Sequence, residues 1–455
     1  MNKNMKKRGH ILIVSSAFAP LNFPGAVRLT KIAKYFDRKK WRVSVLTTKS
    51  GEYMYPKDTI LQRDVDNSDI SIYRTFCFDI FFIKGLLNRK QQGNNTSNYE
   101  NEKIGSKKFK EFKQLRKIVQ KCFYPGNISW CISAKRFIAQ NLNLGSINLM
   151  LTSFSSIASH QLGYFIKKRK PNIFWIADFR DPYVGNIVTK GNVLERLQRM
   201  YARKTEQEIL NSADKVITVS EGLKRSFDEK LGGKGSAIVI YNGYDKEDVA
   251  GKANFSGNKE RFTISYLGKL YGNLRNPALL FDVLDELLKE GAIEKEKLLV
   301  NYAGSDASMM KKYIEKFNIG EIYHDCSLVS REKSLQIQSN SHLLLLLSLN
   351  SSESRGILTS KLYEYINVRR PIICLMTGEG IGELGRLIKD GDLGIACSYQ
   401  HYAESKKKLR EFILKKYREY MHTGKIEYRI NNRFISRFNY ENIVDQIINI
   451  YETTK

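Results

Sequence analysis

The length and charge of the chain limit what the protein can be. Its 455 residues are 42% hydrophobic and carry a formal net charge of +28. This length predicts two or three globular domains and excludes a small protein with a single core. The positive charge indicates an anionic partner, such as a nucleic acid, an anionic lipid or a phosphorylated substrate.

Cysteine usage and hydropathy indicate the compartment. The six cysteines are scattered and form no CxxC pair, which favours a reducing cytoplasm. No run approaches the roughly 18 apolar residues of a membrane span, and the basic N-terminus has no signal-peptide layout. We expect a cytoplasmic protein, either soluble or attached peripherally to the inner face of the plasma membrane.

The first segments predict the β–α–β opening of a parallel sheet. Apolar runs at 10–16 and 41–47 have the length of buried strands, and the pattern between 26 and 36 is helical. Gly25 ends the intervening loop, where it would let a backbone approach a ligand. Because no GxGxxG fingerprint is present, a plain turn is the alternative.

A basic insertion covers about 84–136. Its segment 107–123 has apolar residues near one helical face and lysines largely elsewhere, which is typical of a helix that seeks a membrane surface. An ordinary helix packed on the sheet with a solvated lysine face is the alternative. With the apolar stretch 76–87, this helix would dock a membrane and a lipid-linked substrate.

Polar residues follow the strands predicted at 147–152 and 172–178. His160 lies in the helix after the first of these strands, and Asp178 and Asp181 lie where the second one ends. The carboxyl ends of parallel strands are where chemistry is usually found. The alternatives are an Asp–Arg pair that holds a loop, and a structural histidine.

One acidic pair has the spacing of a metal-binding motif. Asp64 and Asp66 form a DxD sequence, but no further ligands accompany them, so we expect a polar turn here. No metal site is predicted.

The second half predicts another doubly wound α/β domain. Apolar strands alternate with helical stretches, and they fall at 261–268, 298–304, 342–347, 371–375 and 393–397. An Asn-Gly turn at 242–243 marks the domain boundary. We expect domains at 1–240 and 241–435, with a C-terminal helix in 436–455 that packs back across the junction.

The segment 356–365 is the strongest candidate binding site. Ser360 precedes a short helical pattern that begins near Lys361 and contains Glu364. Free backbone N–H groups at a helix start, together with a lysine, suit a diphosphate, and the carboxylate would accept hydrogen bonds from sugar hydroxyls. An ordinary capped helix between two buried strands is the alternative.

These motifs together resemble a known enzyme family. The chain resembles retaining glycosyltransferases of the GT-B fold, close to the family-4 enzymes of bacterial surface-polysaccharide synthesis. The resemblance covers nearly the whole length. It rests on the order of Ala17–Pro20 with Gly25, Asp178–Asp181, Ala213–Ser220, Asn242–Asp245, Tyr266–Gly268 and Ser360–Tyr365 with Pro371 and Ile372. It implies two Rossmann-like domains that face a central cleft.

The resemblance also implies where the donor binds. The N-terminal domain would hold the acceptor, and the C-terminal domain would hold a UDP- or GDP-sugar. Glu364 would bind the donor ribose. Lys361, with Lys269 or Arg275, would bind the diphosphate beside Gly268 and Ser360, and Gly25 would face it across the cleft.

One position departs from the family pattern. A glutamate that contacts the transferred sugar is expected eight residues before Glu364, and Gly356 stands there. Glu353 is a nearby substitute, and the backbone after Gly356 is another. For catalysis, the resemblance leaves Asp178, Asp181 and His160 as candidates for positioning the acceptor or the sugar.

The expected function is transfer of a sugar from a nucleotide sugar to a glycan or lipid-linked acceptor, with retention and without a metal or other cofactor. An anionic membrane surface is a further expected partner, and a nucleic acid is not. Two alternatives stay open. One is a nucleotide-sugar epimerase on the same fold; the other is a nucleic-acid or membrane-surface binding protein that acts through charge.

Overall fold

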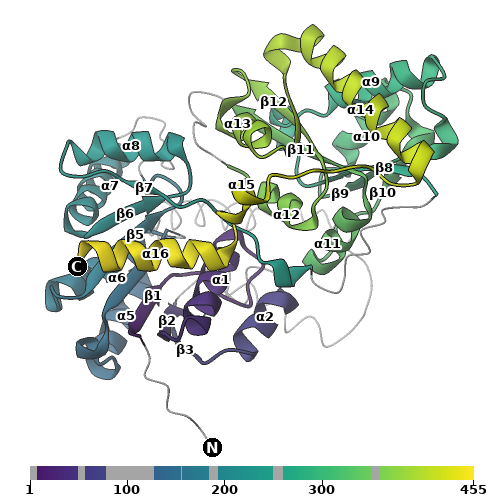
Figure 1. Ribbon diagram of the computed structural model, residues 1–455. Helices are drawn as coiled ribbons and strands as arrows, with labels where there is room; N and C mark the ends of the chain where they lie inside the picture. Colours follow the sequence, from purple (N-terminus) through teal and green to yellow (C-terminus); the bar gives the residue numbers. More distant parts are fainter. Residues whose placement is uncertain are drawn as a thin grey trace, which may run out of the picture. The chain divides into compact units, whose positions relative to one another are not determined.

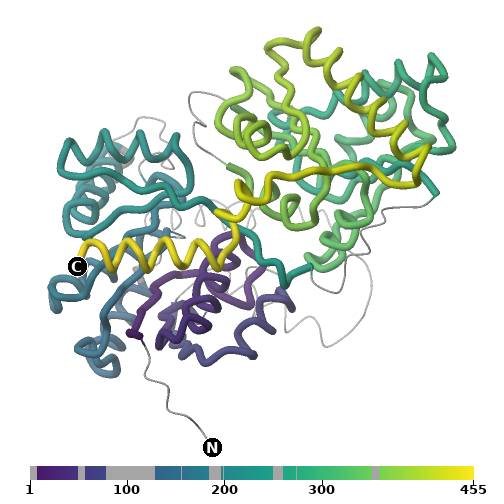
Figure 2. Tube along the Cα trace, in the orientation of Figure 1, coloured from purple at the N-terminus to yellow at the C-terminus, as the bar shows by residue number. Residues whose placement is uncertain are grey.

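The computed structural model describes residues 8–49, 57–77, 128–154, 156–183, 193–249, 260–350 and 358–455. The chain divides into two compact units, which can be followed in Figures 1 and 2. Unit 1 comprises Met1–Thr218, Ser226–Ile238 and Ile447–Lys455, and unit 2 comprises Val219–Arg225 and Val239–Gln446. The basic helix expected at 107–123 and the positions Glu353 and Gly356 lie outside the described residues.

Unit 1 is built on a seven-stranded sheet in the order β3-β2-β1-β4-β5-β6-β7. The pairings from β3 to β6 are all parallel, and Ile11 of β1 lies opposite both Val43 of β2 and Leu149 of β4. The strands are β1 (His10–Val14), β2 (Arg42–Thr48), β3 (Ile70–Thr75), β4 (Leu149–Ser153), β5 (Phe174–Phe179), β6 (Lys215–Thr218) and β7 (Ile238–Val239).

Helices connect these parallel strands, as crossover geometry requires. They are α1 (Pro24–Arg38), α2 (Thr59–Asp66), α5 (Ile128–Asn141), α6 (Ile157–Arg169), α7 (Val193–Ser212) and α8 (Glu221–Leu231). The helix α1 has a proline in its first turn, where the missing N–H costs nothing. Ser220 accepts a hydrogen bond from the Leu223 amide at 3.1 Å and so caps the start of α8.

Unit 2 contains a six-stranded, fully parallel sheet in the order β10-β9-β8-β11-β12-β13. Its strands are β8 (Phe262–Leu267), β9 (Leu298–Ala303), β10 (Tyr323–Asp325), β11 (Leu343–Asn350), β12 (Ile372–Gly378) and β13 (Gly394–Ser398). Its helices are α9 (Ala278–Lys289), α10 (Ala307–Lys316), α11 (Arg331–Asn340), α12 (Lys361–Val368), α13 (Gly382–Asp390), α14 (Tyr402–Thr423) and α15 (Asn432–Ser436), followed by α16 (Tyr440–Thr454).

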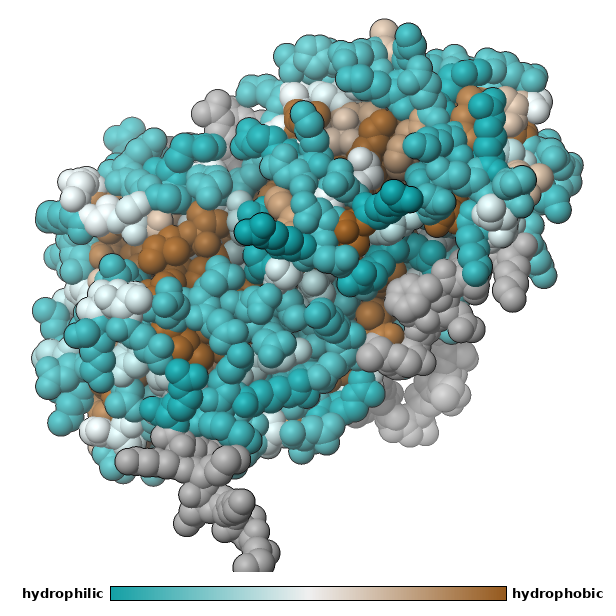
Figure 3. Space-filling model, viewed as in Figure 1, coloured by the Kyte–Doolittle hydropathy of each residue, from teal (hydrophilic) through white to brown (hydrophobic). Residues whose placement is uncertain are grey.

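Both sheets are buried on their two faces, which explains the continuous apolar runs in the sequence. In β11 the five leucines 343–347 are at most 1% exposed. Leu343, Leu345 and Leu347 pack in one core with residues of β8, β9, α9 and α14. The exterior is mainly hydrophilic on the face seen in Figure 3. Among the residues that the structure describes, none of the helices combines the length and the hydrophobicity that a membrane span requires.

The strand order identifies where a ligand would bind. Numbered along the chain, each sheet has the order 3-2-1-4-5-6, with β7 added at the edge of unit 1. This is the Rossmann order, and the chain direction switches between the first and fourth strands. The prediction of two doubly wound α/β domains is therefore confirmed. Ligands of such sheets bind at the carboxyl ends of the strands beside the switch point, namely β1 and β4 in unit 1 and β8 and β11 in unit 2.

The last helix, α16, belongs to both units. Its residues up to Gln446 are part of unit 2, and those from Ile447 are part of unit 1. Within unit 1, the Tyr451 ring packs edge-on against Trp41 at 5.7 Å and against Phe174 at 5.5 Å between ring centroids. Arg8 adds an ion pair with Glu452 at 2.9 Å. These contacts fix the end of the helix to the first sheet.

Candidate functional site

The residues expected to bind the donor lie at the switch point of unit 2. The helix α12 begins at Lys361 and buries Leu362, Tyr363 and Tyr365, while Lys361 and Glu364 stay half-buried. Tyr365 donates a hydrogen bond to the Leu345 carbonyl of β11 at 3.1 Å. The apolar face thus anchors α12 to the sheet, and the two charged residues remain on its accessible side.

The side chain of Lys361 crosses the end of strand β8. A Cβ atom at Gly268, the residue after β8, would lie 2.9 Å from Lys361 Cε. That separation is shorter than real Cβ contacts, so the lysine can take this path only because Gly268 has no side chain. The structure therefore brings Gly268 and Lys361 together at the carboxyl end of the central strand.

The loop after Gly268 is held by a network of aromatic and acidic side chains. Tyr302 donates to the Gly268 carbonyl at 3.1 Å, and Asp306 accepts from the Leu270 amide at 2.6 Å. The Leu270 amide lowers the pKa of the Asp306 carboxyl, because it stabilises the charged form. The loop is consequently fixed where it approaches the site.

Lys269 and Arg275 belong to this fixed loop. The Tyr266 hydroxyl donates to the Lys269 carbonyl at 2.7 Å and also bonds the Arg275 side chain. Burial raises the pKa of Tyr266, so its hydroxyl stays protonated as a donor. The Arg275 guanidinium lies 4.5 Å from the ring centre of Tyr271. The loop thus presents two cations next to the strand end that Lys361 crosses.

Glu364 has a buried partner that the sequence analysis did not identify. The Gln338 amide, from α11, donates to Glu364 Oε2 at 3.2 Å and to Ser334 Oγ at 3.0 Å. Gln338 is fully buried, and its Oε1 atom has no hydrogen-bond partner among the described residues. A buried amide with one satisfied end fixes the direction of the carboxylate that it contacts.

The acidic residues predicted in unit 1 have different environments. Asp178 is fully buried at the end of β5 and forms an ion pair with Arg28 of α1, whose Nε lies 3.1 Å from Oδ2. Ser153, at the end of β4, donates to the same carboxylate at 2.9 Å. Asp181 is half-buried in the loop beyond the strand. Asp178 therefore connects β5, β4 and α1, whereas Asp181 keeps access to solvent.

His160 is also fully buried. Its Nδ1 atom lies 2.6 Å from Thr152 Oγ1, which in turn accepts the indole N–H of Trp175 at 2.9 Å. The ring packs on Phe179 with 4.3 Å between centroids. Burial lowers the pKa of His160 to about 3, so the imidazole is neutral at physiological pH. It lies against the same strand ends as Asp178.

Gly25 is the second residue of α1 rather than part of the preceding loop, because the helix begins at Pro24. A Cβ at this position would lie 2.6 Å from a terminal nitrogen of Arg180. The same guanidinium donates to the Phe154 carbonyl at 2.8 Å. Gly25 thus leaves room for Arg180, a residue of the Asp178–Asp181 motif.

The predicted site residues fall into two groups. Gly25, His160, Asp178 and Asp181 belong to unit 1. The six others, Gly268, Lys269, Arg275, Ser360, Lys361 and Glu364, belong to unit 2. Arg28 and Gln338 complete these groups through their contacts with Asp178 and Glu364. No sequence motif marks either residue, and only the structure shows that both are buried at the site.

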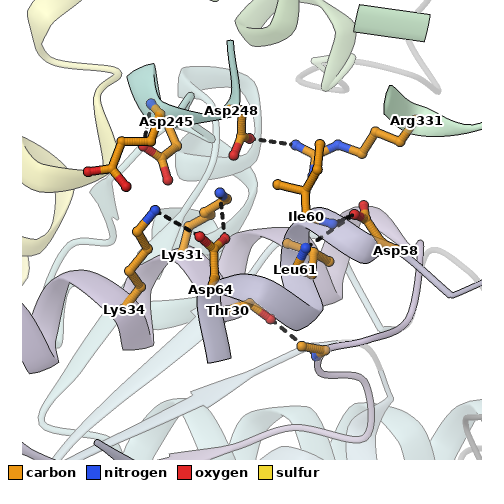
Figure 4. A network of polar contacts seen from close by, with 12 residues as sticks. Thr30, Lys31, Lys34, Asp58, Ile60, Leu61, Asp64, Asp245, Asp248 and Arg331 are labelled. Carbon is orange, nitrogen blue, oxygen red and sulfur yellow. Dashed lines mark hydrogen bonds and ion pairs between the residues drawn. The ribbon is translucent and has the colours of Figure 1, made fainter. Parts of the chain in front are cut away.

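The expected turn at the DxD sequence is wrong, because Asp64 and Asp66 are in the helix α2. Asp64 forms ion pairs with Lys31 at 2.6 Å and with Lys34 at 2.8 Å, both on α1 (Figure 4). Asp58 caps the start of α2 through the Ile60 amide. Two lysines therefore engage Asp64, which joins α2 to α1.

No protein-family model and no curated protein sequence matches the chain. Solved structures do match its fold. Sucrose-phosphate synthase from Thermosynechococcus elongatus aligns over 98% of this chain and 99% of that chain, with 14% identity and a TM-score of 0.55. The lipopolysaccharide outer core galactosyltransferase WaaB aligns over 98% and 100%, with 12% identity and a TM-score of 0.55.

A third similar structure is HepE of Anabaena in complex with UDP and glucose. It aligns over 97% of this chain and 99% of that chain, with 13% identity and a TM-score of 0.53. At identities this low, the structural similarity shows the fold alone, and the chemistry has to be argued from the residues of the site. The chain has the GT-B fold, with two Rossmann-like domains.

Proposed function

We propose that the protein is a glycosyltransferase that moves a sugar from a nucleotide-sugar donor to a glycan or lipid-linked acceptor. The observation that carries this proposal is the position of Lys361 over Gly268, beside Glu364, at the switch point of unit 2. The proposed setting is bacterial surface-polysaccharide synthesis in the cytoplasm, at the inner face of the plasma membrane.

The donor would bind through its diphosphate and ribose. Lys361, Lys269 and Arg275 would supply three cations around the end of β8, and the Ser360 hydroxyl would add a donor at the start of α12. Glu364, oriented by Gln338, would accept hydrogen bonds from the ribose hydroxyls. A UDP- or GDP-sugar has the charge and the hydroxyl groups that this arrangement would recognise.

The same cations would serve the chemistry. When the bond between the sugar and the diphosphate breaks, negative charge develops on the leaving group, and fixed cations and N–H groups stabilise it. Such a site requires no metal ion. We propose a retaining reaction in which the acceptor attacks from the face of the leaving phosphate, whose oxygen helps to remove the acceptor proton.

The residues of unit 1 would arrange the acceptor. Asp181 is half-buried and would contact the acceptor or the transferred sugar, whereas Asp178 and His160 are fully buried. We assign Asp178 a positioning role, because its bonds to Arg28 and Ser153 fix the strand end that leads to Asp181. His160 would support the same strand end through its contact with Phe179.

Calorimetric titration with UDP-, GDP- and other nucleotide sugars tests the donor site. Lys361→Ala and Glu364→Ala should each weaken donor binding by roughly tenfold or more, the loss expected for a charged hydrogen bond of about 1.5–3 kcal/mol. Lys311→Ala is the matched control, because that lysine is 74% exposed on α10 and is not one of the predicted site residues. Full affinity in both site variants would refute the assignment.

Sugar transfer tests the reaction itself. A nucleotide sugar that binds should be consumed only when a glycan or lipid extract is present, with the sugar recovered on the acceptor. Conversion of the donor sugar without any acceptor would instead identify an epimerase on this fold.

A further inference from the structure

Three neighbouring helices form a continuous surface on unit 1. Gln161 of α6 joins them: its Oε1 atom lies 3.7 Å from Cys131 Sγ of α5, and its Nε2 atom donates to Tyr201 Oη of α7 at 3.3 Å. Figure 1 labels α5, α6 and α7 on unit 1. Exposed residues of the three helices therefore belong to one surface, here called the α5–α7 face.

Basic residues outnumber acidic ones on the α5–α7 face, where Glu208 of α7 is an exposed carboxylate. No Asp or Glu occurs in α5, in α6, or between 196 and 204 in α7. Seven basic side chains on these segments are exposed, namely Lys135, Arg136, Lys168, Arg169, Arg196, Arg203 and Lys204. This excess of basic over acidic side chains gives the face a positive potential.

Large apolar side chains are exposed among these charges. On α7, Leu197 is 56%, Met200 65% and Tyr201 56% exposed, and Ile132 of α5 is 52% exposed. The three α7 residues have the spacing i, i+3, i+4, so they share one side of the helix. That side faces outward, because Ala202, Ile209 and Leu210 occupy the buried side.

Aromatic rings lie below some of the cations. The Arg169 guanidinium lies 3.6 Å from the ring centre of Phe165, and Lys135 lies 5.2 Å from it. Lys168 lies 5.3 Å from the ring centre of Tyr164. Aromatic and basic side chains that alternate in this way are typical of the boundary between lipid headgroups and acyl chains.

We propose that the α5–α7 face docks on an anionic lipid bilayer. The seven cations would contact lipid phosphates, while Leu197, Met200, Tyr201 and Ile132 would enter the headgroup boundary. Charge complementarity favours this occupant over a neutral or basic protein surface. The exposed aliphatic residues favour it over a nucleic acid, whose phosphates would leave Leu197 and Met200 in water.

The inference deepens the proposed function, because it names the surface that would place the enzyme next to a lipid-linked acceptor. It is distinct from the helix expected at 107–123. Its test measures membrane binding, so it does not depend on the donor chemistry.

The test is co-sedimentation of the full chain with phosphatidylcholine vesicles, with and without phosphatidylglycerol. The wild type should bind the anionic vesicles and bind the neutral ones weakly. Arg196→Gln with Arg203→Gln should lower the partition coefficient about 25-fold at low salt, at roughly fivefold for each cation. Leu197→Gln with Met200→Gln should lower it while leaving its salt dependence unchanged.

Two matched controls test whether vesicle binding depends on the α5–α7 face rather than on any exposed charged or apolar side chain. Leu328→Gln replaces a leucine that is 79% exposed on unit 2, and Arg429→Gln replaces an arginine whose side chain is 93% exposed there. Both should bind vesicles like the wild type. All the substituted side chains are at the surface, so thermal unfolding should show unchanged folds.

Three results would overturn the inference. The first is no binding of the wild type to anionic vesicles, and the second is equal binding by the α7 variants. The third is loss of self-association in the α7 variants, seen by light scattering, without any effect on vesicles. Donor affinity measured on the same variants identifies a failure of the proposed function independently, because it reports on unit 2.

Discussion

The buried ion pair of unit 1 offers a direct test of what Asp178 does. Substituting Asp178 by Asn keeps the size of the side chain and an oxygen that can accept from Ser153. It removes the charge that neutralises Arg28, and both side chains of the pair are 0% exposed. Arg28 would then lose the carboxylate with which it is paired in the native structure.

The size of the effect follows from this burial. Breaking a buried pair by removing one partner costs about 3–5 kcal/mol of unfolding free energy. For a unit of this size, each kcal/mol lowers the melting temperature by about 2–4 °C, so Asp178→Asn should lower it by roughly 6–20 °C. Donor binding at a temperature where the variant is folded should stay unchanged, because the donor residues belong to unit 2.

Chemical denaturation of Asp178→Asn, Arg28→Met and the double variant forms the assay. The double variant should lose less stability than the two single variants added together, because it leaves no unpaired buried charge. Additive losses, or a loss below about 1 kcal/mol for Asp178→Asn, would refute a pair that stabilises the unit. A folded Asp178→Asn variant with normal acceptor affinity but no turnover would show that the carboxylate acts in the reaction.

Three further predictions concern single side chains. Gln338→Leu should weaken binding of a ribonucleotide diphosphate but not of its deoxyribose analogue, because the Glu364 carboxylate loses the hydrogen-bond donor that orients it. Gln336→Leu, at an exposed position on the same helix as Gln338, should have no effect. Equal losses of affinity for both nucleotides would contradict this role of Gln338. Gly268→Ala should reduce donor affinity with little loss of stability, since a Cβ displaces the flexible Lys361 side chain, and in a Lys361→Ala background it should add nothing. His160 has a pKa of about 3 in the folded protein and its ordinary pKa of about 6.5 when the chain is unfolded. Between these values only the unfolded chain binds the proton, so the free energy of unfolding should fall as the pH drops from about 6.5 toward 3. His160→Leu should flatten this pH dependence of stability, and an unchanged slope would exclude His160 as its cause.

The layers of the fold were accessible from the sequence because parallel strands buried on both faces have a simple pattern. The apolar run at 342–347 corresponds to β11, and the run at 10–16 corresponds to β1. The edge strands β3 and β10 are not predicted. β3 is half-buried and has polar residues between its apolar ones, and β10 has only the three residues Tyr-His-Asp, two of them exposed. A hydrophobic pattern in the sequence indicates burial, and these two strands are less buried than the central ones.

The candidate site was only partly accessible, because its partners are distant in the chain. Arg28 contacts a residue 150 positions away, and Gln338 contacts one 26 positions away on another helix. Neither has a local motif, and an arginine in an amphipathic helix is ordinarily expected at the surface. The ion pairs of Asp64 with Lys31 and Lys34 were not accessible from the sequence either, since both lysines belong to a separate helix.

The contacts of Tyr451 have a consequence for how the protein is made. The segment 447–455 belongs to unit 1 and packs through Tyr451 on Trp41 and Phe174. A ribosome synthesises this segment after all of unit 2, and domains otherwise fold in order as they emerge. Unit 1 therefore begins folding first and is completed last. The apolar surface that includes Trp41 and Phe174 stays exposed to solvent in nascent unit 1 while unit 2 is being translated.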